Sequence, residues 1–327
     1  MKKRVFTSLL GLSLLLMAGC AAKSSETTET TQAAQAEGKK ETYKIGVLQL
    51  VQHDALDLAN KGFFAALDDA GISYEADQQN AGGEQSSAVL IAEKFANDKP
   101  DLIFAIATPA AQAAAAANTE IPIVITAVTD PAVSGLVESN EKPGNNVTGT
   151  SDLNPVKEQI DLLKKLVPQA KKIAILYSSA ESNSKLQADL AHEYAKEIGL
   201  EYEDYTISSS NELQSVTESM IGKVDAIYVP TDNMVSAGIS AVAMVANENK
   251  LPIICGEEGM LPGGALATYG VDYFELGYLS GKQAIRILTE GAKPSEMPIE
   301  YLDAKQLEVA VNEEVAELLG IDVSLIK

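Results

Sequence analysis

The segment IPIVITAVTDP, residues 121–131, constrains the fold of this chain more than any other. Its first half is a short run of mostly β-branched apolar residues, which favours a parallel strand buried on both faces. The run turns polar at Thr126, Thr129 and Asp130, and Pro131 prevents further strand pairing. In open α/β sheets, ligands bind beyond the carboxyl ends of the strands. The segment therefore predicts a buried strand whose end forms part of a binding crevice.

The same pattern of a short apolar run followed by an amphipathic helix recurs along the chain. Two successive arrays of this kind, separated by a crossing near residues 147–152, indicate two similar α/β lobes with parallel sheets rather than one large sheet. The helix at 274–288 and the tail after Met297 are expected to cross between the lobes again. We therefore expect residues 43–152 and 272–296 to form the first lobe, and residues 153–271 and 297–327 to form the second.

The N-terminus has the features of an export signal. Basic residues at positions 2–4 precede an apolar stretch, and Ala18-Gly19-Cys20 ends it, so residues 1–19 are typical of a cleaved signal peptide. Residues 20–42 contain many Ser, Thr, Glu and Ala but no aliphatic anchors, which predicts a flexible tether. The box LLMAGC resembles that of bacterial lipoproteins, and this resemblance implies that Cys20 is lipidated and attached to the extracytoplasmic face of the cell membrane.

Composition excludes several functions. A formal net charge of −21 over 327 residues, without a basic cluster beyond the N-terminus, argues against nucleic-acid binding. The chain lacks a GxSxG elbow, an HExxH motif, a CxxC motif and a Walker loop, and it has only two histidines. The sequence therefore predicts a protein that is not an enzyme and that needs neither a metal nor a cofactor.

Polar and small residues follow several of the predicted strands and are the candidates for lining the crevice. Hydroxyl groups, a helix N-terminus and carboxylates together suit a ligand that carries both an ammonium and a carboxylate group, although each carboxylate alone can also be a helix cap. The candidate ligand-binding residues are His53, Thr108, Pro109, Ala110, Thr126, Ala127, Thr129, Asp130, Ser178, Ser179, Asn183, Thr231, Asp232, Glu257 and Glu258.

Seven segments, taken in order, resemble the substrate-binding lipoproteins of ABC importers. They are LLMAGC, LVQHDALDLANKGF, ATPAAQA, TAVTDPAVSGLV, YSSAESNS, VPTDNMV and GYLSGKQA. More narrowly, the chain resembles the type I periplasmic-binding-protein branch that includes binders of tryptophan and other aromatic amino acids. The resemblance implies two Rossmann-like lobes joined by three hinge strands, which close on a ligand and dock on a membrane permease.

The resemblance also implies roles for particular residues. The ligand carboxylate would meet first-lobe groups at Thr108, Ala110, Thr126 and Thr129, and the ammonium would meet either Asp232 or the pair Glu257 and Glu258. We expect a monomeric receptor that captures tryptophan, tyrosine or phenylalanine for an ABC permease. Two alternatives stay open at this point: a sensor of the same fold that signals to a kinase, and a surface hydrolase or reductase.

Overall fold

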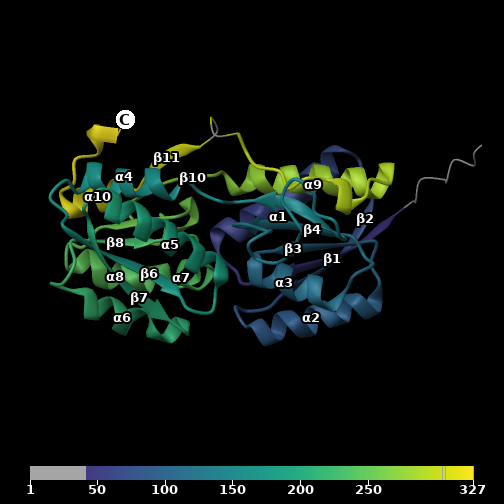
Figure 1. The fold of residues 1–327 in the computed structure, drawn as a ribbon, viewed down its shortest axis with the longest axis horizontal. Coiled ribbons are helices and arrows are strands. Elements are labelled where there is room, and N and C mark those ends of the chain that lie inside the picture. The colour runs from purple at the N-terminus through teal and green to yellow at the C-terminus, as the bar shows by residue number, and fades with distance from the viewer. Residues whose placement is uncertain (1–41, 304, 306, 327) are drawn as a thin grey trace, which may run out of the picture. The chain divides into compact units, whose positions relative to one another are not determined.

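The computed structural model describes residues 42–303, 305 and 307–326, which form two α/β lobes (Figure 1). The expected signal peptide, Cys20 and all but the last residue of the expected tether lie outside the described residues. Within the part of the chain that is described, no helix is both long and apolar enough to span a membrane.

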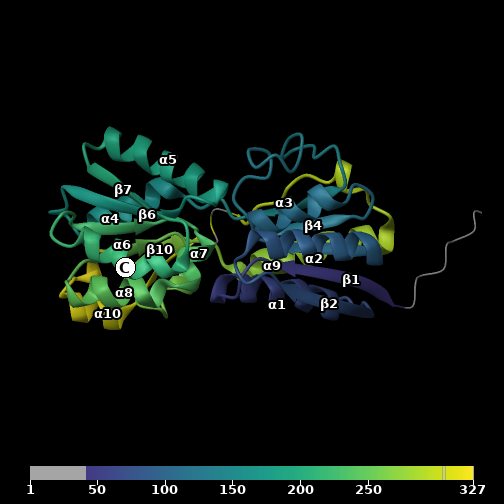
Figure 2. The ribbon, with the colours of Figure 1, turned by 90° about the horizontal axis from the view of Figure 1, so that it is seen from below.

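The first lobe is built on a five-stranded parallel sheet in the order β2-β1-β3-β4-β5. Helices α1 and α9 cover one face of this sheet, and α2 and α3 cover the other (Figures 1 and 2). The strands are β1 (Tyr43–Gln49), β2 (Tyr74–Asn80), β3 (Leu102–Ile106), β4 (Ile123–Val128) and β5 (Val147–Ser151). The helices are α1 (Asp54–Asp69), α2 (Gln85–Asp98), α3 (Thr108–Ala117) and α9 (Tyr273–Glu290), with the 3-10 turn η3 (Pro294–Glu296) after α9.

The second lobe contains a six-stranded sheet in the order β11-β10-β9-β8-β6-β7, parallel except for β11. One hydrophobic cluster beneath α4, α5 and α10 and another beneath α6, α7 and α8 fill its two faces. The strands are β6 (Lys172–Ser178), β7 (Glu201–Ile207), β8 (Ala226–Val229), β9 (Ile253–Cys255), β10 (Ala267–Gly270) and β11 (Glu308–Val311). The helices are α4 (Val156–Leu166), α5 (Ser182–Glu197), α6 (Leu213–Met220), α7 (Asn233–Ala237), α8 (Ile239–Glu248) and α10 (Glu313–Leu319), with 3-10 turns η1 (Ser210–Glu212), η2 (Glu258–Met260) and η5 (Val323–Ile326).

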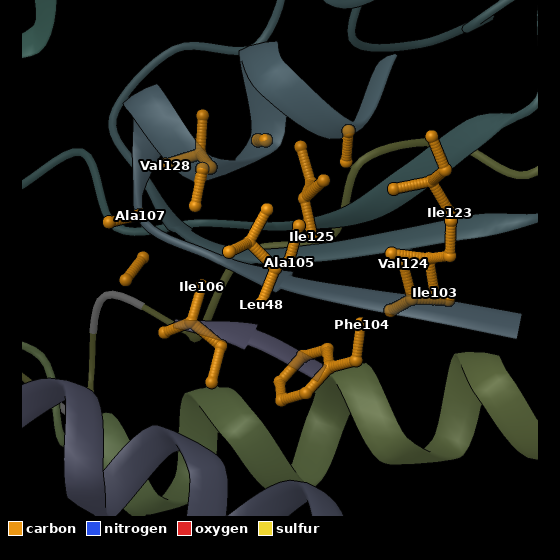
Figure 3. Packing of buried hydrophobic residues seen from close by; sticks show 14 of the residues in the cluster. Leu48, Ile103, Phe104, Ala105, Ile106, Ala107, Ile123, Val124, Ile125 and Val128 are labelled. Carbon is orange, nitrogen blue, oxygen red and sulfur yellow. The ribbon is translucent and has the colours of Figure 1, made fainter. Parts of the chain in front are cut away.

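Every residue of β3 and β4 is buried, as the continuous apolar runs predict for central parallel strands. Figure 3 shows the packing of these strands, with Phe104 pointing from β3 toward helix α9. The ring of Phe104 stacks on that of Phe63 from α1, with 3.8 Å between the ring centroids. These contacts anchor the sheet, and the strand ends that border the crevice are therefore held by a rigid core.

Glycines allow α1 and α9 to pack backbone against backbone, although more than 200 residues separate the two helices in sequence. A Cβ atom at Gly277 would lie 1.9 Å from the Ala59 carbonyl oxygen, and one at Gly62 would lie 2.0 Å from the Phe274 carbonyl oxygen. No side chain fits at either position. Helix α9 therefore belongs to the first lobe, although it follows the whole β6–β10 array in the chain.

The tail beyond η3 crosses between the lobes later than the expected boundary at residue 297. Met297 and Ile299 are buried in the core of the first lobe, and Glu300 forms a bridge with Thr150 beside β5. The chain reaches the second lobe only afterwards, where β11 pairs with β10 in antiparallel fashion. The apolar residues at 297 and 299 explain the difference, because they cover the edge next to β5 before the chain leaves.

Candidate functional site

A small cavity lies where the two lobes meet, and residues from both lobes line it. We call it the acidic cavity. Its first-lobe and hinge residues follow β1, β4 and β5 or open α1 and α9, and its second-lobe residues follow β6, β8 and β9. The lining residues are His53, Leu56, Ala127, Thr129, Asp152, Asn183, Thr231, Asp232, Asn233, Ser236, Glu257 and Tyr273.

Two strand ends of the first lobe have strained backbone next to this site. Ala107 (φ 85°) follows β3, and Ala127 (φ 54°) lies at an irregularity in the pairing of β4 with β5. Left-handed conformations of non-glycine residues are uncommon, and bulges of this kind often re-aim residues near functional sites. Ala127 itself lines the cavity, so the local distortion of β4 shapes the wall of the site.

Asp152 and Glu257 carry carboxyl groups that are fully buried. Burial raises the pKa of Asp152 to about 6, although its Oδ2 accepts a hydrogen bond of 2.7 Å from the Tyr273 hydroxyl. Burial also raises the pKa of Glu257 to about 7. Hydrogen bonds from the Ser236 hydroxyl (2.8 Å) and the Gly259 amide (2.5 Å) act in the opposite direction and lower it. The cost of placing these carboxylates in a closed site is thus only partly offset by their hydrogen bonds.

Two more acids lie at this site, Asp232 in the cavity lining and Glu181 next to Asn233, and burial raises the pKa of both. Asp232 caps α7 by accepting from the Val235 amide at 2.8 Å, and it also accepts from the Ser178 amide at 2.6 Å. Glu181 accepts from the side chain of Asn233 at 2.5 Å and from the Met234 amide at 3.0 Å. Both acids therefore order the start of α7 and add negative charge close to the cavity.

The described residues that line the acidic cavity include no Lys or Arg. Among residues 42–303, 305 and 307–326, no group of three or more His, Cys, Asp and Glu side chains is arranged to hold a metal ion. The acidic cavity therefore gathers several carboxyl groups without a cationic side chain among its described lining residues.

Three buried hydrogen-bond acceptors in the cavity lining have no protein partner: Nδ1 of His53, Oδ1 of Asp152 and Oδ1 of Asn183. His53 Nε2 lies 3.3 Å from Oδ1 of Asn233, whose amide nitrogen is engaged by Glu181. Because that oxygen can only accept, Nε2 carries the proton and Nδ1 is left as an acceptor. Burial lowers the pKa of His53, which favours this neutral ring. One acceptor comes from the first lobe, one from a connecting segment and one from the second lobe.

An apolar pocket adjoins the acidic cavity and shares Asn233 with it. Both lobes contribute to this pocket as well. Its lining residues are Leu50, Val51, Gly83, Gln85, Pro109, Ala180, Glu181, Asn233 and Met234. A polar cavity next to an apolar pocket matches a ligand with a charged end and an apolar end.

The structure brings seven of the residues predicted from the sequence into the lining of the acidic cavity: His53, Ala127, Thr129, Asn183, Thr231, Asp232 and Glu257. Pro109 lines the adjoining apolar pocket. Thr108 and Ala110 are buried at the start of α3, and Oγ1 of Thr108 has no protein partner.

Five other predicted residues lie outside the lining. Thr126 is buried within the sheet, 3.0 Å from the Thr150 hydroxyl. Asp130 accepts from the Ala132 and Val133 amides and so stabilises its own turn. Ser178 engages Asp232 through its backbone amide, the exposed Ser179 donates to the Ile207 carbonyl, and Glu258 is exposed beside a separate pocket. The side chains of Thr126, Asp130, Ser178 and Ser179 each make a local loop or sheet contact, whereas that of Glu258 is exposed.

Sequence reasoning missed Leu56, Asp152, Asn233, Ser236 and Tyr273 in the cavity lining. Asp152 follows β5 directly, so the sequence marks it in the same way as the other acids at strand ends. No sequence pattern marks Tyr273, because only the return of α9 to the first lobe brings its hydroxyl to Asp152.

Direct contacts hold the two lobes together around the cavity. Gln187 of α5 donates to the Thr129 hydroxyl at 3.2 Å, and His53 contacts Asn233. Both contacts join residues of the cavity wall, so the described conformation encloses the site from two sides.

Comparisons with known proteins agree with this architecture. The family described as ABC transporter substrate binding protein matches residues 44–325. A curated relative named tyrosine-binding protein, from Clostridioides difficile (strain R20291), is 44% identical over 321 residues, which cover 97% of this chain and 91% of the relative.

Two solved structures show high similarity. A domain from Streptococcus pneumonia in complex with L-Trp is 38% identical with a TM-score of 0.83, and the alignment covers 86% of this chain and 96% of that one. The ligand-free, open structure of a substrate-binding protein with adhesive properties from Clostridium difficile is 44% identical with a TM-score of 0.65, covering 86% and 95%. The described arrangement is thus more similar to the ligand-bound relative, despite the lower sequence identity.

The order of the two sheets, the enclosed site between them and the match over residues 44–325 lead to one assignment. The strand order and the high similarity to solved members also confirm the expected type I periplasmic-binding-protein fold. Substrate-binding proteins of ABC transporters are typically not enzymes. This chain belongs to the family of ABC transporter substrate-binding proteins.

Proposed function

We propose that this protein captures an aromatic amino acid, with tyrosine or tryptophan as the first candidates, outside the cytoplasm for an ABC importer. The observation that carries the proposal is the set of three unpartnered acceptors in the acidic cavity, on His53, Asp152 and Asn183. An amino-acid ammonium has three N–H donors and one positive charge. It matches both the number of acceptors and the surplus of negative charge.

The ammonium is assigned to Asp152 first, because that carboxylate has a free oxygen inside the cavity. Glu257 adds a second negative charge from the other lobe. Asp232, which the family resemblance offered as an alternative, is already used by the Val235 and Ser178 amides. Its contribution is therefore charge and support for the wall rather than direct capture.

The ligand side chain is assigned to the apolar pocket formed by Leu50, Val51, Pro109 and Met234 together with polar neighbours. The ligand carboxylate is assigned to the start of α3, where the buried Thr108 hydroxyl has no protein partner and a helix N-terminus favours anions. The relative named tyrosine-binding protein and the relative solved with L-Trp both support an aromatic ligand.

Capture proceeds by closure of the lobes, because acceptors from both lobes surround the cavity. We further propose that Cys20 is lipidated and holds a monomeric protein at the outer face of the membrane, where the closed form meets a permease. The site gives no support to an enzymatic role, since the described side-chain partner of His53 is Asn233 and not a serine or cysteine. No feature of the site favours a kinase-linked sensor over a transporter.

The experiment uses the absence of tryptophan from this chain, which has 11 tyrosines and no Trp. Indole emission excited selectively then reports only added L-tryptophan, and it should shift to shorter wavelength as the ring leaves water. L-tyrosine should compete with it, whereas leucine and glutamate should compete poorly. Calorimetry with L-tyrosine gives its affinity directly. If neither aromatic amino acid binds, the ligand assignment is wrong, although membership of the family stands.

A further inference from the structure

The turn Glu257–Met260 touches both the acidic cavity and the first lobe. Glu257 lines the cavity, and two residues later Gly259 lies against the N-terminus of α1. An ideal Cβ atom at Gly259 would lie 2.8 Å from the Ala55 amide nitrogen and 3.1 Å from Cβ of Asp54. Only glycine allows the second lobe to approach this closely.

We infer that this turn converts ligand capture into lobe closure, and that Gly259 is the positioning residue that permits the lobes to meet. The inference rests on the proposed closure around an amino acid. The Glu257 carboxylate accepts from the Gly259 amide, so the residue that faces the ligand also fixes the shape of the turn that docks on α1.

The chemistry of the contact explains why closure needs a ligand. His53, the N-cap residue of α1, forms no side-chain cap, and the first turn of α1 carries Asp54 and Asp57. Asp54 therefore faces the carboxylate of Glu257 across the lobe boundary, and their repulsion contributes to the raised pKa of Glu257 after the larger effect of burial. Asp152 repels Glu257 from the hinge side in the same way. A bound ammonium compensates this negative charge. Closure is therefore more favourable when the site is occupied than when it is empty.

A side chain at position 259 should weaken closure of the lobes while each lobe still folds normally. The Glu257 oxygen, 2.7 Å from the same Cβ position, is the end of a flexible side chain and is able to shift. The α1 backbone is fixed by its packing on α9. Gly259 does not have a positive φ angle, so alanine fits the turn itself. The clash with the fixed backbone of α1 therefore arises only when the lobes meet.

The first test compares Gly259→Ala with wild type and with the control Glu258→Ala, whose side chain is exposed next to it. We expect Gly259→Ala to keep wild-type thermal stability without ligand. Its affinity for L-tyrosine should fall by about tenfold or more, because the closed state is less populated. At saturating L-tyrosine, small-angle scattering should show contraction for wild type and Glu258→Ala but not for Gly259→Ala. Equal contraction in all three would overturn the inference.

The second test does not depend on the ligand. This test keeps Gly259 and uses Asp54 at the start of α1 and Glu258 of the turn, which are both exposed beside the contact of Gly259 with α1. In the double variant Asp54→Cys/Glu258→Cys, a short bis-maleimide reagent should cross-link the two thiols, which peptide mass spectrometry detects, and the cross-linked protein should stay contracted without ligand. Failure to cross-link, with or without L-tyrosine, would show that the lobes do not meet here. If wild type does not bind L-tyrosine but the cross-link forms, the ligand assignment fails while the contact is supported.

Discussion

Asp152→Asn should stabilise the ligand-free protein at neutral pH and, at the same time, weaken ligand binding. The substitution keeps the size of the side chain and an oxygen that accepts from the Tyr273 hydroxyl, but it removes the charge. Because the carboxylate is fully buried, its pKa rises from the ordinary value of 3.8 to about 6. The folded protein therefore binds the proton more tightly than the unfolded chain does.

The direction of the pH dependence follows from linkage. Below about pH 4 the carboxyl group is protonated in both states, and Asp152 costs nothing. As pH rises through about 6 the unfolded chain ionises first, so the folded state loses stability relative to it. A shift of about two units corresponds to about 3 kcal/mol at neutral pH. This value is an upper bound, because opening of the lobes hydrates the carboxylate.

Binding should change in the opposite direction. Removing one partner of a buried ion pair costs roughly 3 to 5 kcal/mol, which is about two to three and a half orders of magnitude in affinity. Urea unfolding at pH 4 and pH 7.5 measures the first effect, and calorimetry with L-tyrosine measures the second. Asp130→Asn is the matched control, because Asp130 stabilises a turn outside the cavity. Wild-type affinity in Asp152→Asn, or a loss of stability at pH 7.5, would refute the assignment of the ammonium to this carboxylate.

Four other outcomes test separate parts of the structure. Asp232→Asn should lower the free energy of unfolding by about 1 to 3 kcal/mol, which chemical denaturation measures. The two carboxylate oxygens accept from the Val235 and Ser178 amides, and asparagine offers only one acceptor oxygen, so one buried amide loses its partner. Gly277→Ala should lower the melting temperature, because its Cβ would overlap the Ala59 carbonyl oxygen and force α9 away from α1. An unchanged melting temperature in calorimetry would contradict this. L-tyrosine binding near pH 7 should release protons, because an ammonium lowers the raised pKa of Glu257; binding heats should then differ between buffers of different ionisation enthalpy. Cys20→Ala should move the protein from the membrane fraction into the medium or periplasm, and unchanged fractionation would contradict lipid anchoring.

The sequence predicts the sheets well because their central strands depend on local composition. Ile123, Val124 and Ile125 of the apolar run at 121–125 are buried in β4 as expected. Thr126, expected just beyond the end of this strand, instead lies within it, because β4 continues to Val128. Strand β2 is different, because its polar segment Tyr74–Asn80 lies at a sheet edge and pairs on one side only. No apolar run marks such a strand, so local composition does not reveal its bounds.

The sequence predicts a lining residue correctly only where the position of that residue depends on the strand before it. Thr129 follows β4 directly, and His53 and Asn183 lie at the starts of the helices that follow β1 and β6. The topology of parallel sheets brings such positions together. Whether a strand-end acid faces the ligand is decided by other segments. Asp232 is occupied by the amides of Ser178 and Val235, one of which comes from a neighbouring strand.

Asp152 shows that tertiary contacts decide which strand-end acid faces the cavity. Its position after β5 made it equivalent, in sequence, to Asp130 after β4. The two differ because the Tyr273 hydroxyl reaches Oδ2 of Asp152 from the start of α9, 121 residues later, and leaves Oδ1 unpartnered in the cavity. Asp130 instead meets the amides of its own loop. The glycines at 62 and 277 set the close packing of α9 on α1, and through it the place of Tyr273. In this proposal, the identity of the ligand-facing acid is determined by a helix contact far from the site, which no local pattern around either aspartate encodes.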